Sequence, residues 1–162
     1  MKKTLMIFAV LGLTILTGCG NGEKKEASPY GKTEQKTEAK AVDATPASVR
    51  VDLTNKGIGP IKSVTLSPEI DKEMAEKGEG VFKMNCTACH KADKKFIGPA
   101  PKGILERRTP EWVMNMIMNP DEMTQKDPLA KDLLVEFNGS PMANQHMSEE
   151  QTRQILEYFR TL

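Results

Sequence analysis

The sequence predicts an all-α domain of about four helices over residues 68–162, preceded by a segment that is poor in apolar residues. Three pairs of a capping residue and a proline mark helix starts, at Ser67-Pro68, Thr109-Pro110 and Asp127-Pro128. Proline suits the first position of a helix, where no backbone N–H donor is needed. A fourth start, from Ser148 to Gln151, has the pattern of a capping box. No convincing strand pattern occurs in this part of the sequence.

Residues 1–18 have the features of an export signal. Lys2 and Lys3 precede an apolar run from Leu5 to Leu16, which suits a signal peptide and is too short to span a bilayer comfortably. The run ends in Leu16-Thr17-Gly18-Cys19, which resembles the lipobox of bacterial lipoproteins. The resemblance implies cleavage before Cys19, a lipid on its thiol, and anchoring outside the cytoplasmic membrane of a bacterium, facing the periplasm or the cell exterior. The alternative is an ordinary secretory signal with a coincidental cysteine.

Residues 19–67 are expected to comprise the lipidated Cys19, a flexible linker and a short extended arm. Up to about residue 47, Gly, Lys, Glu, Ala and Thr dominate, which leaves too few apolar residues to offset chain entropy and predicts disorder. Val49, Val51 and Leu53 then alternate with Arg50 and Asp52. This period of two predicts a hairpin, or an arm laid on the domain, over residues 49–66.

Apolar residues recur at helical spacing after each helix start. The first helix is expected to carry Phe82 on its inner face and to end near residue 86. The second is expected to end at Asn119-Pro120, with Met123 in a polar loop beyond it. The third is expected to end at Asn138-Gly139 and is followed by the helix that begins at Ser148.

The segment Cys86-Thr87-Ala88-Cys89-His90 carries the chemistry of the chain. C-x-x-C-H is the pattern of covalent c-type haem attachment. Two thiols at this spacing can reach the two vinyl groups along one porphyrin edge, and the histidine is then held under the iron as its fifth ligand. A zinc half-site or a redox dithiol is the alternative, but the sequence has neither a second ligand pair nor a βαβ setting. The pattern therefore predicts one covalently attached haem c.

Residues 68–162 resemble a class I c-type cytochrome with one haem and a His/Met ligand pair. Besides the haem motif, the resemblance rests on Gly78 and Phe82 in the first helix, Ile155 and Tyr158 in the last helix, and Gly98-Pro99 after the motif. It implies that Gly78 lets the first and last helices cross closely. It also implies that the carbonyl of Pro99 accepts a hydrogen bond from the proximal imidazole, which fixes its tautomer.

In this family the sixth iron ligand is a methionine in a non-helical loop before the last helix. Met142 lies in such a loop, six residues before Ser148, and is expected to ligate the iron. His146 in the same loop is the alternative ligand, which would give a bis-histidine haem of lower potential. Met147 is expected to pack beneath the last helix, beside the haem pocket.

The only tryptophan of the chain, Trp112, lies at the start of the second predicted helix. Trp112 is expected either in the core or as an indole N–H donor to a haem propionate. Arg107 and Arg108 are two further candidates for propionate contacts.

These features predict a membrane-tethered electron carrier rather than an enzyme. It would pass single electrons between redox protein partners of a respiratory chain and would have no small-molecule substrate. One alternative is a haem sensor or small haem enzyme with an open or weakly ligated distal site. Another is a fixed cytochrome subunit of a larger reductase or oxidase complex. The formal net charge of +1 gives no support to nucleic-acid binding.

Charge is distributed unevenly along the predicted domain. Basic residues cluster from Lys91 to Arg108, and acidic residues dominate from Asp121 to Glu136. This pattern predicts either a charge dipole that orients docking to a redox partner or simply two solvated faces.

Overall fold

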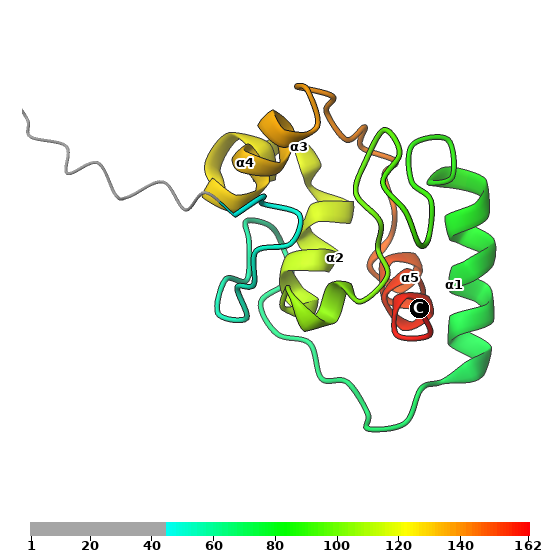
Figure 1. Cartoon of the computed structure of the whole chain (residues 1–162). Helices are drawn as coiled ribbons and strands as arrows, with labels where there is room; N and C mark the ends of the chain where they lie inside the picture. The colour runs from blue at the N-terminus through cyan, green and yellow to red at the C-terminus, as the bar shows by residue number, and fades with distance from the viewer. Residues whose placement is uncertain (1–44) are drawn as a thin grey trace, which may run out of the picture. The chain divides into compact units, whose positions relative to one another are not determined.

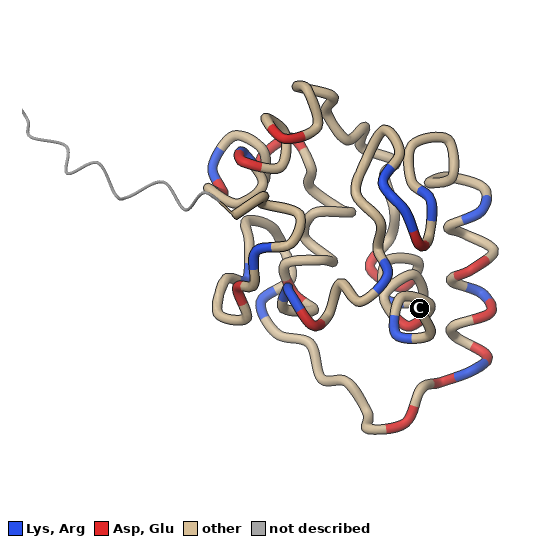
Figure 2. Tube along the Cα trace, in the orientation of Figure 1, with Lys and Arg blue, Asp and Glu red and all other residues tan. Residues whose placement is uncertain are grey.

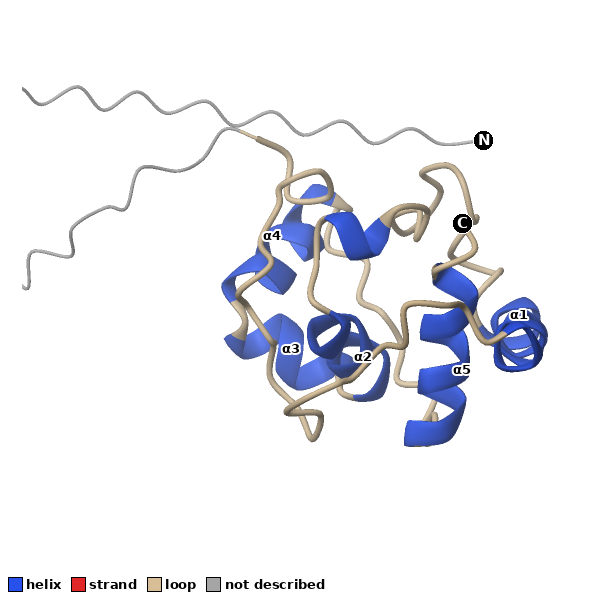
Figure 3. Ribbon diagram, turned by 90° about the horizontal axis from the view of Figure 1, so that it is seen from below, coloured by secondary structure: helices blue, strands red, loops and turns tan. Residues whose placement is uncertain are grey.

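The computed structural model describes residues 45–162 (Figure 1). The predicted signal peptide, Cys19 and the linker up to residue 44 lie outside the described residues. The described part contains five α-helices and one short 3-10 helix: α1 (Lys72–Asn85), η1 (Ile104–Glu106), α2 (Pro110–Met118), α3 (Pro120–Lys126), α4 (Pro128–Glu136) and α5 (Glu149–Phe159). Its only β-type pairing is an isolated bridge between Asp52 and Arg108, and Figure 3 shows helices and loops alone. The all-α prediction is therefore confirmed, with one helix more than expected.

The additional helix is α3. The sequence pattern predicts a helix end at Asn119-Pro120, but the chain turns at Asn119 and Pro120 opens a new helix. Met123, expected in a polar loop, is fully buried in this helix, and its sulfur lies 2.9 Å from the backbone nitrogen of Ile58. A proline after a polar residue marks helix starts as well as helix ends, and here the buried methionine favours the start.

Three of the four predicted helix starts are confirmed. The side chains of Thr109 and Asp127 cap α2 and α4, and the capping box at Ser148 is complete. The first start is wrong, because α1 begins after Asp71, whose carboxylate accepts a hydrogen bond from the N–H of Met74. The carbonyl of Ser67 instead accepts a hydrogen bond from the Arg160 guanidinium at 2.7 Å, so a tertiary contact holds this segment outside the helix.

Helices α1 and α5 lie side by side and cross steeply (Figures 1 and 3). Gly78 is at the crossing, where a Cβ atom would lie 1.9 Å from the carbonyl oxygen of Gln154. Next to it, the ring of Phe82 packs edge-on against Phe159 and at a tilt against Tyr158, with centroid separations of 5.7 and 5.5 Å. The close helix crossing implied by the resemblance is thus present.

The segment 45–66, called the arm below, packs on α2, α3 and α4 as an extended chain without a hairpin. Ala47 and Ile61 are buried in the core. In a usual alternating segment the apolar side chains face the core. At residues 49–53 they face outward instead, because Val49, Val51 and Leu53 are more than half exposed. The folded unit therefore begins well before the boundary expected at residue 68, since the contacts that hold the arm come from distant helices and leave no local signal.

None of the helices in the described part of the chain is both long enough and apolar enough to cross a membrane.

Candidate haem site

The haem motif opens onto a large cleft between the loop after α1, helices α2 and α4, and the loop before α5. The cleft has a main lobe and a smaller lobe. Seven residues line both lobes: Cys86, His90, Pro99, Ile104, Trp112, Met116 and Met142. Apart from His90 these are apolar or sulfur-containing side chains, as a porphyrin pocket requires.

The motif forms one turn that continues directly from α1. The N–H of Cys86 donates to the carbonyl of Phe82, and the N–H groups of Cys89 and His90 both donate to the carbonyl of Cys86, at 3.1 and 2.8 Å. This turn brings both cysteines to the main lobe. Burial, with a smaller contribution from Cys89, raises the pKa of the Cys86 thiol to about 11, so the free thiol is uncharged at neutral pH.

His90 is held in one orientation by the residues that follow it. Its Nδ1 lies 2.8 Å from the carbonyl oxygen of Pro99. Because a carbonyl can only accept, Nδ1 carries the proton and donates it, which leaves the lone pair of Nε2 free for a metal ion. Gly98 lies flat against the ring, since a Cβ atom there would be 2.5 Å from the imidazole Cε1. The predicted hydrogen bond from His90 to Pro99 is therefore present.

The loop before α5 places its two candidate ligands differently. Met142 is half-buried and lines both lobes together with His90. His146 is exposed and is not among the cleft-lining residues; its backbone has a φ of 52° and its N–H donates to the side chain of Asn144 at 2.8 Å. Met147 packs against the hydrophobic core, as expected, but does not line the cleft.

Trp112 lines the cleft with its ring. Its indole N–H donates to the buried carboxylate of Asp127 at 3.1 Å. Of the two roles expected for Trp112, the core position is present, since the residue is buried in the hydrophobic core. Its N–H is not free for a propionate, because Asp127 at the start of α4 already accepts it. No local sequence pattern indicates this pairing, which joins two helices across 15 positions.

Arg107 and Arg108 line the main lobe. Within the described part of the chain, the Nε atom of each is buried without a hydrogen-bond partner. Unpaired guanidinium N–H groups beside an apolar cleft suit the carboxylates of a ligand. Together with the two thiols and the oriented imidazole, they fit a haem with two propionates.

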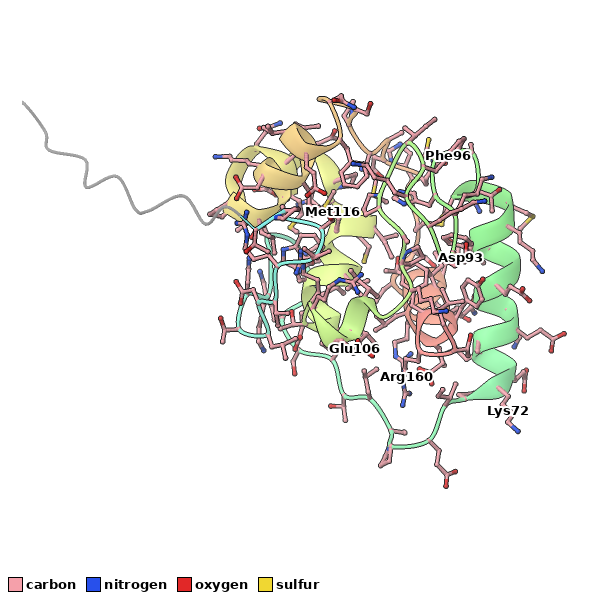
Figure 4. The ribbon with its side chains drawn as sticks, viewed as in Figure 1. Lys72, Asp93, Phe96, Glu106, Met116 and Arg160 are labelled. Carbon is pink, nitrogen blue, oxygen red and sulfur yellow. The ribbon has the colours of Figure 1, made fainter. Side chains whose placement is uncertain are left out.

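Several cleft residues were not predicted as site residues. Met116 is one of them: it lies on α2 (Figure 4) and lines both lobes. Leu133 of α4 and Phe137, the residue directly after that helix, also line the main lobe, and only their inner-face spacing could have indicated this. Ser48 of the arm reaches the same lobe without any sequence signal.

A charge dipole, one of the two arrangements expected, is only half present. Lys and Arg gather on the loop that follows α1 (Figure 2), where Lys91 lies over the ring of Phe96. In the acidic half, Asp127 is buried, Asp132 pairs with Arg50 at 2.7 Å, and Glu136 accepts hydrogen bonds from Ser48. These carboxylates hold the arm and α4 in place instead of forming an open acidic face.

A turn that presents two thiols and an oriented histidine to an apolar cleft defines a c-type haem protein. The family model for cytochrome c matches residues 75–162, and the chain belongs to the cytochrome c family. It therefore binds one covalently attached haem c.

Solved structures of related proteins agree with this assignment. A cytochrome c from Rhodothermus marinus has 46% sequence identity and a TM-score of 0.62, over 64% of this chain and 88% of that chain. An engineered form of that protein, bound to a carbene intermediate, has 45% identity and a TM-score of 0.59 over the same shares. A cytochrome c2 of Rhodopseudomonas palustris is 53% identical over 34 residues, which is 21% of this chain. The chain spans only 29% of the length of that curated relative.

Proposed function

We propose that the protein is a membrane-tethered, class I monohaem electron carrier. Haem iron bound in the cleft supplies the chemistry, a one-electron exchange between the ferric and ferrous states. The observation that supports this most is that His90 and Met142 line one apolar cleft together with Cys86 and Cys89. In this proposal the two thiols become thioethers, His90 is the proximal ligand and Met142 is the distal ligand.

The residues of the cleft tune the iron for electron transfer. The Pro99 carbonyl makes the imidazole of His90 more basic and holds it in place. The thioether of Met142 is a soft, neutral ligand, and a His/Met pair gives a relatively high reduction potential. Both ligands come from short loops that are anchored at α1 and α5, which limits rearrangement when the charge of the iron changes.

The composition of the cleft favours a carrier over a haem enzyme. The residues that line it include no carboxylate and no histidine other than His90. A peroxidase-type reaction needs distal groups that transfer protons, and the nearest candidate, His146, is exposed outside the cleft.

Electron exchange requires a partner to approach the edge of the haem. Cys89 is exposed, and the neighbouring Phe96 and Ile97 are about half exposed. Phe96 lies near the tip of its loop (Figure 4), and Lys94 and Lys95 beside it are exposed as well. An apolar patch with a basic rim supports docking of redox proteins that carry acidic residues.

An optical spectrum tests the ligand pair. The oxidised protein should show the weak long-wavelength band of methionine-to-iron ligation. Met142→Ala should abolish this band, whereas the matched variants Met147→Ala and His146→Ala should keep it. Absence of the band in the parent protein, or its survival in Met142→Ala, would exclude Met142 as the ligand.

A second experiment tests the tether, which depends on the lipobox-like sequence that ends at Cys19. In a bacterial host, the full chain should incorporate radiolabelled fatty acid and sediment with membranes. Cys19→Ala should remove the label and release the protein while leaving its haem content unchanged. Unlabelled parent protein in the soluble fraction would exclude the lipid anchor.

A further inference from the structure

The arm is attached to the rest of the molecule through the side chain of Arg108. This residue is 1% exposed, and its guanidinium donates hydrogen bonds to the carbonyls of Ala47, Arg50 and Arg107. Two of these three acceptors belong to the arm. The backbone of the arm also runs beside the backbone of Arg108: Asp52 forms an isolated bridge with Arg108, in which the N–H of Asp52 donates to the carbonyl of Arg107 at 2.9 Å. The arm therefore determines where this guanidinium lies.

The arm is itself held by side chains from two helices. The buried amide of Asn115 on α2 bonds the carbonyl of Lys56 at 2.9 Å and both the N–H and the carbonyl of Ile61, at 3.0 and 2.9 Å. The carboxylate of Glu136 on α4 accepts from the N–H of Ser48 at 2.8 Å. Since Asn115 does not line the cleft, it can be changed without touching the haem site.

Arg108 brings a buried positive charge to the wall of the cleft. Burial lowers its pKa to about 10, with Arg107 and Arg50 acting in the same direction and Asp52 and Asp127 opposing them. The side chain is therefore cationic at neutral pH. Its guanidinium carbon lies 5.3 Å from the centre of the Trp112 ring, and both residues line the main lobe.

We propose that the arm is a clamp that sets the reduction potential of the haem, by holding the charge of Arg108 against the cleft. Reduction adds one electron inside the cleft, and a cation nearby stabilises that added negative charge. Coulomb's law makes such an interaction large wherever water is excluded. The unpaired Nε of Arg108 additionally provides a donor for a propionate. This inference rests on the proposed role as an electron carrier.

Potentiometric titration of the haem-loaded protein tests the clamp. At a fixed applied potential, Arg108→Met should lower the ratio of ferrous to ferric protein roughly tenfold, which is about 59 mV for a one-electron couple. Asn115→Ala, which releases the arm, should lower the same ratio by about threefold, a typical coupling between neighbouring groups. If Arg108→Met does not fold, Arg108→Gln replaces it with the same expected shift.

A double variant that combines Arg108→Met with Asn115→Ala distinguishes a clamp from a general loosening of the fold. Asn115→Ala should have no further effect on the ratio when Arg108 is already replaced. Arg107→Met is the matched control: Arg107 lines the same lobe, but its guanidinium donates to the carbonyls of Lys102 and Gly103 outside the arm. Asn115→Ala should therefore keep its threefold effect in the Arg107→Met background.

Three results would overturn the clamp. The first is an unchanged ratio of ferrous to ferric protein in Arg108→Met. The second is an equal effect of Asn115→Ala on this ratio with and without Arg108. The third is loss of the methionine-to-iron band in Arg108→Met, because the change in the ratio would then come from a lost iron ligand. A parent protein without any reversible one-electron couple would instead defeat the electron-carrier proposal and the clamp together.

Discussion

Replacing Gly78 by alanine tests the crossing of α1 and α5 most directly. The new Cβ would lie 1.9 Å from the carbonyl oxygen of Gln154 and 2.4 Å from its carbonyl carbon. Both atoms belong to the backbone of α5, so no side-chain rotation can relieve the clash. Gly80, two residues further along α1, has no neighbouring atom within 4 Å of the position that a Cβ would take, and it provides the matched control.

The geometry sets the size of the effect. Carbon and oxygen need a separation of about 3.2 Å, so α5 must move away from α1 by about 1.3 Å. A gap of this size forfeits at least about half of each dispersion contact across the interface. Overpacking usually costs about 1–3 kcal/mol, and the rigid obstacle puts Gly78→Ala at the upper end, about 3 kcal/mol. Gly80→Ala should instead stabilise the protein by about 0.5–1 kcal/mol, because alanine favours helix.

Guanidinium unfolding, followed by far-UV circular dichroism on samples with equal haem content, measures both variants. The midpoint should fall for Gly78→Ala and rise for Gly80→Ala. A Gly78→Ala protein within about 1 kcal/mol of the parent would refute the reasoning, since it would mean that the helices can separate without loss of packing. Equal changes in both variants would refute it too.

Three further predictions concern the site and its supports. Gly98→Ala should displace the His90 ring and weaken its ligation about 10- to 100-fold. Guanidinium titration of the haem absorbance should then show loss of the histidine ligand at a lower guanidinium concentration than in the parent. Asp127→Ala should lower the free energy of unfolding by about 1–3 kcal/mol, because it removes the acceptor of the Trp112 indole N–H inside the core. Denaturant titration measures this change, and a loss below about 0.5 kcal/mol would contradict the contact. Hydrogen bonds from the backbone and side chain of Thr54 hold the pKa of Asp52 below its ordinary value. Its stabilising effect should thus be complete above about pH 4 and vanish as the pH falls through the lowered pKa, so Asp52→Asn should be less stable than the parent near pH 7 and equal to it in strong acid.

Helix starts could be predicted from the sequence where the capping group is local. Thr109, Asp127 and Ser148 each bond a backbone N–H three residues ahead, so the whole signal lies within a few positions. Ser67 offered the same local pattern as these three. Its carbonyl is instead engaged by Arg160, 93 positions away, and such a contact has no local signature.

The proximal side of the cleft was predictable for a similar reason. Cys86, His90 and Pro99 lie within one short loop, and their order alone indicates how they meet. The opposite wall depends on contacts between distant segments, such as Ser48 and Arg108. An alternating pattern at residues 49–53 normally places the apolar side chains inward, but here those side chains are exposed and Arg50 between them pairs with Asp132 of α4. Only the three-dimensional structure shows this inversion.

The way the fold closes on itself has a consequence for the order of events during biosynthesis. Ser48 meets Glu136, and Arg160 meets the carbonyl of Ser67, so both ends of the folded unit are tied across 88 and 93 positions. A chain made from its N-terminus cannot form the first tie until α4 has emerged, and it cannot form the second until the residue after α5 has emerged. Cys86, half-buried once the fold has closed, remains accessible throughout that interval. The long-range ties thus leave a period before folding in which haem can be joined to both thiols, and they then enclose it.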